Sequence, residues 1–255
     1  MDGLLLIPFL AVAFVGGVAS GLAGFAFGLI VSGVWLHIIT PLQMASLIVG
    51  YGLFVQSYGI WKYRQHFNWR HVIPLIIGGT IGAPIGTWLL RYINPGYLRL
   101  GVGVLLIAYS SYGLLRPRVK GVPANVPVEL GIGLLNGLLT GMTGLAGVFV
   151  TLWCGMRGWS KDTQRSVYQP VILAAFVTAA ISLIAAGAIT ADFIKLYFLA
   201  APAMIAGMLL GFKLYGHLND DAFRKVILVL LLLSGVSLMV PEVVAIASGL
   251  PPRAR

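Results

Sequence analysis

A long uncharged stretch near the start of the chain constrains its fold more than any other feature. No Asp, Glu, Lys or Arg occurs from Phe9 to Trp61, and a second charge-free run extends from Phe198 to Phe212. A helix that crosses the hydrocarbon core of a bilayer needs about 20 apolar residues. Charged residues make up 9% of the chain, whereas soluble domains carry about 25%. The sequence therefore predicts an all-α polytopic membrane protein.

Charges and helix-breaking residues divide the chain into eight apolar segments. We expect them at about Leu4–Leu36, Leu42–Trp61, Val72–Leu90, Tyr97–Leu115, Val128–Met156, Ser166–Ala188, Phe193–Leu214 and Ala222–Val240. The polar, proline-rich sequence RPRVKGVPANVP separates two groups of four. The predicted parts are a first membrane repeat at residues 1–115, a connector loop at 116–127, a second repeat at 128–240 and a C-terminal tail at 241–255.

The two groups of four segments resemble each other in their glycine positions. The pair Gly21-x-x-Gly24 recurs 120 residues later, and the pair Gly82-x-x-x-Gly86 recurs 125 residues later. Single matches between small residues are common in apolar sequence, but here they keep their order and nearly keep their offset. The sequence therefore predicts two homologous halves.

The basic loops indicate how these halves are oriented. Three basic residues follow the second segment of the first half, whereas three follow the first segment of the second half. Because basic loops face the cytoplasm, the halves are expected to be inverted repeats. Inversion requires an odd number of crossings in each half, which predicts that the long, glycine-rich segments one and five are broken or re-entrant.

Segment five contains the sequence NGLLTGMTGLAGVFV at residues 136–150, with four glycines and two threonines. Each glycine costs a helix interior about 1 kcal/mol relative to alanine. Transporters with inverted repeats place broken helices at the membrane midplane, where half-helix N-termini point at anionic substrates. A close crossing of two helices through small residues is the alternative. The predicted substrate-binding positions in the two breaks are Thr140, Gly141, Thr143 and Gly144, with Gly21, Gly24 and Phe25 in the first half.

Four stretches of the chain resemble the sulfite exporter TauE/SafE family, also called the toluene sulfonate uptake permease family. They are SGLAGFAFGLIVSGVWL, HFNWRHVIPLIIGGTIGAPIGTWLLRYINPGYLRLGVGVLL, NGLLTGMTGLAGVFVTLWCGMRGW and PAMIAGMLLGFKLYGHLNDDAFRKVILVLLL. The resemblance covers about Pro8 to Val240, and it departs at GFAFG, where many members have a denser glycine run. It implies a multi-pass transporter of sulfur-containing anions, such as sulfite and organosulfonates, in the bacterial inner membrane.

Arg165 is the charged residue that we expect to meet such an anion. A guanidinium presents a fork of N–H donors suited to oxyanions, and Gln169 follows one helical turn later on the same face. An arginine that reaches to the lipid headgroups, and an amide that bridges two helices, are the alternatives. We expect the Arg165 charge to act on substrate rather than on packing. Gln56 is expected to bridge two helices, and Tyr168 to pack.

The remaining polar residues exclude several other functions. All seven acidic residues are expected at span ends or in loops, which offers no buried carboxylate for proton coupling, and no basic side chain is expected deep in a span. The chain has one cysteine and no metalloprotease, hydrolase or nucleotide-binding motif. The sequence therefore predicts no cofactor, no metal site and no enzymatic activity. Its net charge of +10 is assigned to cytoplasmic loops rather than to nucleic-acid binding.

The expected function is transport of a small sulfur-containing anion by alternating access around a midplane site between the two repeats. A passive anion channel and, less favoured, a membrane-embedded enzyme are the alternatives. The expected partners are the anion and the lipid bilayer of the cell inner membrane, and a homodimer is left open.

Overall fold

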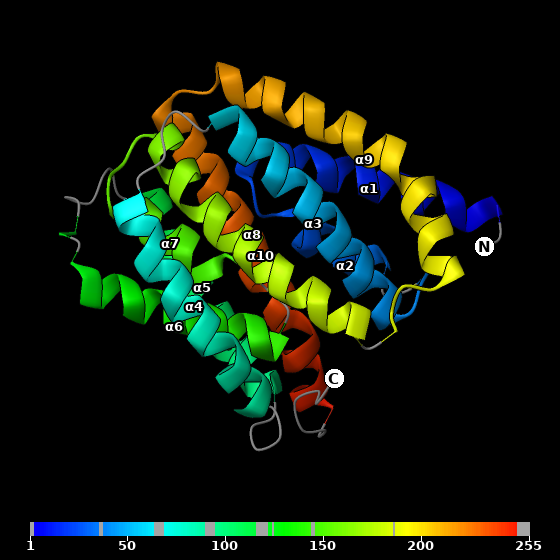
Figure 1. Cartoon of the computed structure of the whole chain (residues 1–255), viewed down its shortest axis with the longest axis horizontal. Coiled ribbons are helices and arrows are strands. Elements are labelled where there is room, and N and C mark those ends of the chain that lie inside the picture. The colour runs from blue at the N-terminus through cyan, green and yellow to red at the C-terminus, as the bar shows by residue number, and fades with distance from the viewer. Residues whose placement is uncertain are drawn as a thin grey trace. The chain divides into compact units, whose positions relative to one another are not determined.

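The computed structural model describes residues 3–35, 38–63, 69–89, 95–115, 122–123, 125–143, 146–185 and 187–248. The connector at 116–127 falls partly outside these residues, and Gly144 falls outside them. The helices, shown in Figure 1, are α1 (Gly3–Ala23), α2 (Phe27–Trp35), α3 (Pro41–Tyr63), α4 (Trp69–Leu89), α5 (Pro95–Leu115), α6 (Val126–Thr143), α7 (Val148–Met156), α8 (Lys161–Ala185), α9 (Ala191–His217) and α10 (Asp220–Ala247). The described part of the chain contains no β-strand.

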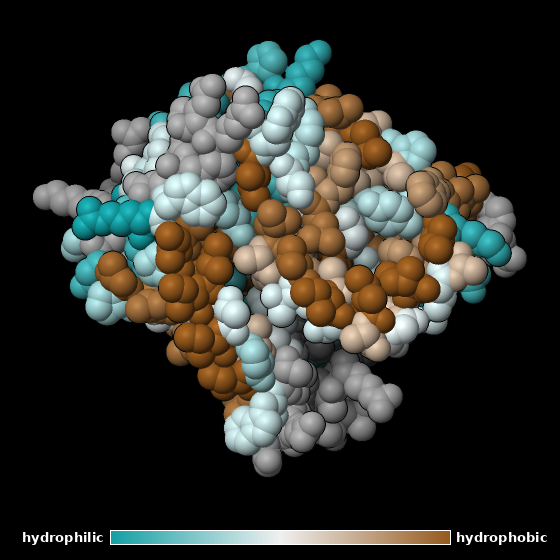
Figure 2. Space-filling model, in the orientation of Figure 1, coloured by the Kyte–Doolittle hydropathy of each residue, from teal (hydrophilic) through white to brown (hydrophobic). Residues whose placement is uncertain are grey.

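The composition of the helices is that of a membrane protein. By length and hydropathy, five described helices could each cross a bilayer: α1, α3, α8, α9 and α10. Large apolar side chains such as Ile7, Phe198 and Leu233 are exposed on their surfaces, and apolar residues occupy much of the face seen in Figure 2. Exposing such apolar surfaces to water is unfavourable, whereas they can face the lipid tails of a bilayer. The chain is therefore an all-α polytopic membrane protein, as the sequence predicts.

Segments one and five are each broken into two helices. The first break separates α1 from α2, and the second separates α6 from α7. Helices α2 and α7 have nine residues each, which corresponds to about 14 Å. Neither is long enough to cross a hydrocarbon core of about 30 Å by itself. The expected interruptions of segments one and five are thus present.

Two helix boundaries differ by five residues or more from those expected. Helix α8 begins at Lys161 rather than near Ser166, because Ser160 caps its first turn: the Ser160 hydroxyl accepts from the Thr163 N–H at 3.4 Å. Helix α10 continues through Pro241 to Ala247, so the first part of the expected tail is helical. Proline removes one backbone donor, a loss that membrane helices tolerate.

The helices form two compact units. The first unit comprises Met1–Val72 and Arg165–Asn219, and the second comprises Ile73–Gln164 and Asp220–Arg255. These units do not coincide with the sequence halves, because each unit takes helices from both of them.

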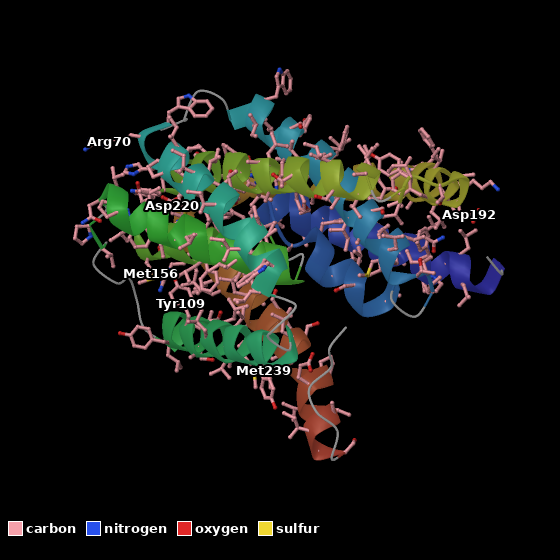
Figure 3. The ribbon with its side chains drawn as sticks, turned by 60° about the horizontal axis from the view of Figure 1, so that its bottom comes forward. Arg70, Tyr109, Met156, Asp192, Asp220 and Met239 are labelled. Carbon is pink, nitrogen blue, oxygen red and sulfur yellow. The ribbon has the colours of Figure 1, made fainter. Side chains whose placement is uncertain are left out.

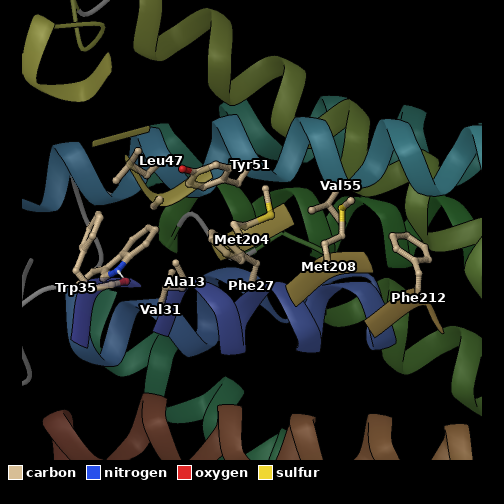
Figure 4. Packing of buried hydrophobic residues seen from close by; sticks show 12 residues of the cluster. Ala13, Phe27, Val31, Trp35, Leu47, Tyr51, Val55, Met204, Met208 and Phe212 are labelled. Carbon is tan, nitrogen blue, oxygen red and sulfur yellow. Dashed lines mark hydrogen bonds between the residues drawn. The ribbon is translucent and has the colours of Figure 1, made fainter. Parts of the chain in front are cut away.

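In the first unit, α1 packs most extensively on α9. A Cβ added at Gly17 would fall on the carbonyl oxygen of Met204, so only glycine allows this close approach of the two backbones. Aromatic and aliphatic side chains from α1, α2, α3 and α9 fill the core beside this contact (Figure 4). Within it, the Trp35 indole N–H donates to the Phe9 carbonyl at 3.2 Å. This core fixes α2 and α3 against α1.

In the second unit, α5 packs extensively on α10. The Met239 side chain of α10 lies against Gly103 of α5, and the Tyr109 hydroxyl of α5 lies against Gly155 of α7 (Figure 3). Helix α10 starts at Asp220, whose carboxylate accepts a hydrogen bond from the Lys161 backbone N–H of α8 at 2.9 Å. Glycines again mark the closest approaches between helices.

Candidate functional site

The first break places four consecutive carbonyl groups and three polar side chains in the interior of the first unit. Helix α1 ends at Ala23, and Gly24 adopts a positive φ of 85° before α2 begins at Phe27. Only glycine adopts this conformation readily, and a Cβ at Gly24 would also lie 2.8 Å from the Tyr168 ring. Residues 23–27 are all buried. The break is therefore a tightly enclosed turn.

Arg165 of α8 caps the C-terminal end of α1. Its Nη2 donates to the Gly21 carbonyl at 2.8 Å, and its Nη1 approaches the Leu22 carbonyl at 3.4 Å. The last four carbonyls of a helix lack intrahelical partners and carry partial negative charge, which a cation stabilises. Arg165 thus holds the end of α1 in place as well as bringing a positive charge to the break.

Two further side chains satisfy the next two carbonyls. The Tyr168 hydroxyl donates to the Ala23 carbonyl at 2.6 Å, and the Gln56 Nε2 donates to the Gly24 carbonyl at 2.5 Å. The expected interhelical role of Gln56 is therefore observed. Tyr168 packs, as expected, with its ring edge-on to Phe25 at 6.4 Å between centroids, but its hydrogen bond was not anticipated.

Arg165 is fully buried, with 0% of its side chain exposed. Its guanidinium carbon lies 4.5 Å from the ring centroids of both Phe212 and Tyr215 on α9. Aromatic faces stabilise a desolvated cation through the ring quadrupole. The alternative of an arginine that reaches to the headgroups is therefore wrong, since the side chain is enclosed by protein. The sequence could not reveal these ring contacts, because α9 lies far along the chain.

Among the described residues of the first unit, Gln169 has the least satisfied polar side chain. It is 0% exposed, and neither its Oε1 nor its Nε2 has a hydrogen-bond partner. Its amide lies against the Cα of Gly59 on α3, since a Cβ at Gly59 would come within 2.7 Å of its Cδ. The Gln56 Oε1, one turn away on α3, is also buried without a partner. Buried polar groups normally have partners, so these two amides are unusual for a protein interior.

The structure thus brings together five of the predicted binding residues around the first break. These are Gly21, Gly24, Phe25, Arg165 and Gln169. The sequence analysis missed Phe212 and Tyr215 as neighbours of the guanidinium. Nothing in the apolar sequence of α9 distinguishes them from packing residues.

The other four predicted residues belong to the second unit. Thr140 and Gly141 lie in the last turn of α6, where the Thr140 hydroxyl donates to the Asn136 carbonyl at 2.7 Å. Thr143 ends α6, and Gly144 lies outside the described residues. Gly147 has a φ of 92° directly before α7. A ligand role for these four residues stays a prediction.

Two carboxylates of the second unit are buried, although no buried carboxylate was expected. Glu129 in the first turn of α6 and Glu242 in α10 are each 1% exposed. The expected last span ends at Val240, which places Glu242 in the tail, whereas α10 continues to Ala247 and includes it.

Comparison with known proteins identifies the family. The family described as "Sulfite exporter TauE/SafE" matches residues 9–238. The chain belongs to the sulfite exporter TauE/SafE family. The "Probable inner membrane transporter protein TsaS" of Comamonas testosteroni is 28% identical over 181 residues, which cover 69% of this chain and 74% of that protein. No solved structure matches the chain significantly.

A second curated TauE/SafE relative covers more of the chain. The "Probable sulfite/organosulfonate exporter TauE" of Cupriavidus necator is 26% identical over 231 residues, which cover 87% of this chain and 89% of that protein. Together with the apolar helices, these relationships make this TauE/SafE member a membrane transporter and a multi-pass inner membrane protein.

Proposed function

We propose that this TauE/SafE transporter carries small sulfur-containing anions, such as sulfite or organosulfonates, and binds them at the first break. The observation that carries the proposal is the fully buried, unpartnered amide of Gln169 one turn from the buried Arg165 guanidinium. Guanidinium and amide N–H groups are donors, and the oxygens of sulfite and sulfonate groups are acceptors. Charge on the anion would offset that of the guanidinium.

The neighbouring groups suit this class of ligand. The acidic residues of the first unit are Asp2 and Asp192, and Asp192 lies at the exposed start of α9, 3.9 Å from Lys195. Negative charge within the unit is therefore scarce. The unpartnered Oε1 of Gln56 is a hydrogen-bond acceptor. It would accept a hydrogen bond from hydrogensulfite or from the ammonium group of an aminosulfonate. The curated relative from Cupriavidus necator carries sulfite and organosulfonate in its name.

Alternating access between two repeats is the mechanism that we propose. A Cβ at Gly207 would meet the backbone oxygen of Phe14, and a Cβ at Gly82 would meet that of Leu134. Gly82 and Gly207 are 125 positions apart, and Phe14 and Leu134 are 120 positions apart. These are the two offsets at which the glycine pairs recur between the sequence halves. This agreement supports two repeats with the same helix contacts, and such repeats are the usual basis of rocking transporters. The first break draws α1 and α3 from one half and α8 and α9 from the other.

Thermal unfolding of the purified protein with added anions tests the proposal. A ligand that binds only the folded protein raises its unfolding temperature with concentration. We expect sulfite, sulfoacetate or taurine to raise it more than sulfate, and acetate to leave it unchanged. Thiosulfate is the sixth compound tested. If all six compounds change the unfolding temperature equally, the site is not selective for this class and the proposal fails. Unitary currents in planar bilayers would instead support a passive channel, and chemical turnover of the anion would support an enzyme.

A further inference from the structure

The guanidinium of Arg157 contacts two tryptophan rings at the end of α7. Its Cζ lies 4.7 Å from the ring centroid of Trp159 and 5.7 Å from that of Trp153. Its Nη1 donates to the Val122 carbonyl, and the Val122 N–H donates to the Met156 carbonyl at 3.2 Å. Met156 is labelled in Figure 3. These contacts fasten one residue of the connector to the last turn of α7.

Two N–H donors of this cluster have no acceptor. The Nε of Arg157 is buried without a hydrogen-bond partner, and so is the Nε1 of Trp153, which is 4% exposed. Arg157 keeps helical dihedral angles (φ −79°, ψ −13°), so the two side chains lie one turn apart on the same side of α7. In the part of the chain that the structure describes, the guanidinium forms no salt bridge. The Arg157 side chain is half-buried, so a ligand can still reach it.

The charge around this cluster favours an anion. Residues 116–121 and 157–164 carry five basic residues and one acidic residue. Glu129 of α6 interacts electrostatically with the Cys154 thiol, as Arg157 does, but it makes no ion pair with Arg157 in the described structure. Basic loops face the cytoplasm, and tryptophans gather at the membrane interface. The phosphates of anionic lipids lie at that depth and attract basic groups.

We propose that Arg157 and Trp153 bind a phosphate group, which comes from an anionic phospholipid or from free phosphate. The Val122 carbonyl occupies Nη1, which leaves the Nε–Nη2 edge of the guanidinium for two phosphate oxygens in a paired arrangement. The Trp153 Nε1–H donates to the same phosphate. All three residues belong to the second unit, so this inference does not rest on the anion site that we propose at the first break.

Thermal unfolding of the detergent-purified protein with added lipid tests the inference. Phosphatidylglycerol should raise the unfolding temperature by about 3–6 °C at about ten times its dissociation constant. Phosphatidylcholine should raise it less, because its own cation balances its phosphate. Arg157→Gln should abolish this difference between the lipids, and Trp153→Phe, which keeps a ring but removes the N–H, should reduce it. Lys213→Gln, at an exposed cation of α9, is the matched control and should retain it.

The lipid shift is measured within each variant, so any stability lost with the Val122 contact does not affect the comparison. Inorganic phosphate, compared with sodium chloride at equal ionic strength, separates the two sources. If phosphate stabilises wild type as much as phosphatidylglycerol does, and Arg157→Gln abolishes both effects, the ligand is free phosphate. A shift with phosphatidylglycerol alone assigns the site to the lipid. The inference is overturned if neither compound stabilises wild type specifically, or if Arg157→Gln and Trp153→Phe respond as Lys213→Gln does.

Discussion

The Arg165 guanidinium donates a hydrogen bond to the Gly21 carbonyl at 2.8 Å, although the two residues stand 144 positions apart in the chain. This contact joins α8 to the end of α1 and lies inside the first unit. Arg165 therefore stabilises the break, in addition to making the anion contact that we propose. The expectation that its charge acts on substrate rather than on packing is incomplete, because the same side chain caps a helix.

Arg165→Ala should reduce both stability and anion binding. The substitution leaves the buried carbonyls of Gly21 and Leu22 without a donor, which we expect to cost on the order of 3 kcal/mol. The stability and anion affinity of Arg165→Lys should lie between those of wild type and Arg165→Ala, because an ammonium keeps the positive charge but loses the paired N–H donors of the guanidinium. Thermal unfolding with and without sulfite measures both effects, with Lys195→Ala as a control that should change neither. A fully stable Arg165→Ala protein that fails to bind sulfite would show that the capping contacts contribute little.

Tyr168→Phe should destabilise the first break without removing any ring contact. The Tyr168 hydroxyl donates to the Ala23 carbonyl at 2.6 Å, and a buried acceptor left without a partner costs about 1–3 kcal/mol. The edge-on contact with Phe25 needs only the ring and should survive. Tyr97→Phe, at a residue that is 61% exposed, is the control. Equal unfolding temperatures for the two variants would contradict the hydrogen bond.

Gly17→Ala and Gly137→Ala should destabilise the protein to a similar extent. A Cβ at Gly17 would fall on the Met204 carbonyl oxygen, and a Cβ at Gly137 would fall on that of Gly79. Backbone atoms cannot turn aside, so each substitution must separate two helices, which we expect to cost more than about 2 kcal/mol. Gly101→Ala is the control, because nothing lies within 4 Å of its added Cβ and alanine favours a helix by about 1 kcal/mol.

The unfolding of these three variants in detergent also tests the repeat. The two glycines are 120 positions apart and their partners are 125 apart, so equivalent helix pairs should respond equally. A large loss at one site with none at the other would show that the second unit does not reproduce the close contact of the first.

The sequence anticipated the parts of this fold that depend on local signals. Long apolar runs located the helices, and the glycine-rich middles of segments one and five located both breaks, because glycine both weakens a helix and permits the positive φ seen at Gly24 and Gly147. The start of α8 was misjudged by several residues. Its capping serine precedes a polar first turn, which was not counted as part of the apolar segment.

Contacts between distant segments could not be anticipated in the same way. The packing of α9 on α1, and of Phe212 on Arg165, depends on which helices meet after the chain has folded. An apolar helix surface offers many equivalent partners to another, because lipid and protein side chains are similarly apolar. The sequence could therefore identify Arg165 and Gln169 as candidate ligands, but not the rings and carbonyls that surround the guanidinium.

Gln169→Leu should separate a ligand role from a packing role. Leucine nearly preserves the volume of the side chain and removes an amide that has no partner, so stability should stay the same or rise by about 1 kcal/mol. Sulfite binding should nevertheless weaken about tenfold or more, because an amide donor to a charged ligand is lost. Gln43→Leu is the matched control, since the Gln43 amide accepts from the Thr40 N–H at 3.1 Å and lies outside the break. Isothermal titration with sulfite and unfolding without it provide the two measurements. A Gln169→Leu protein that is more stable and binds sulfite as tightly as wild type would show that the amide is only an unsatisfied polar group in the interior. The anion site would then have to lie elsewhere, and the second break would be the next place to test.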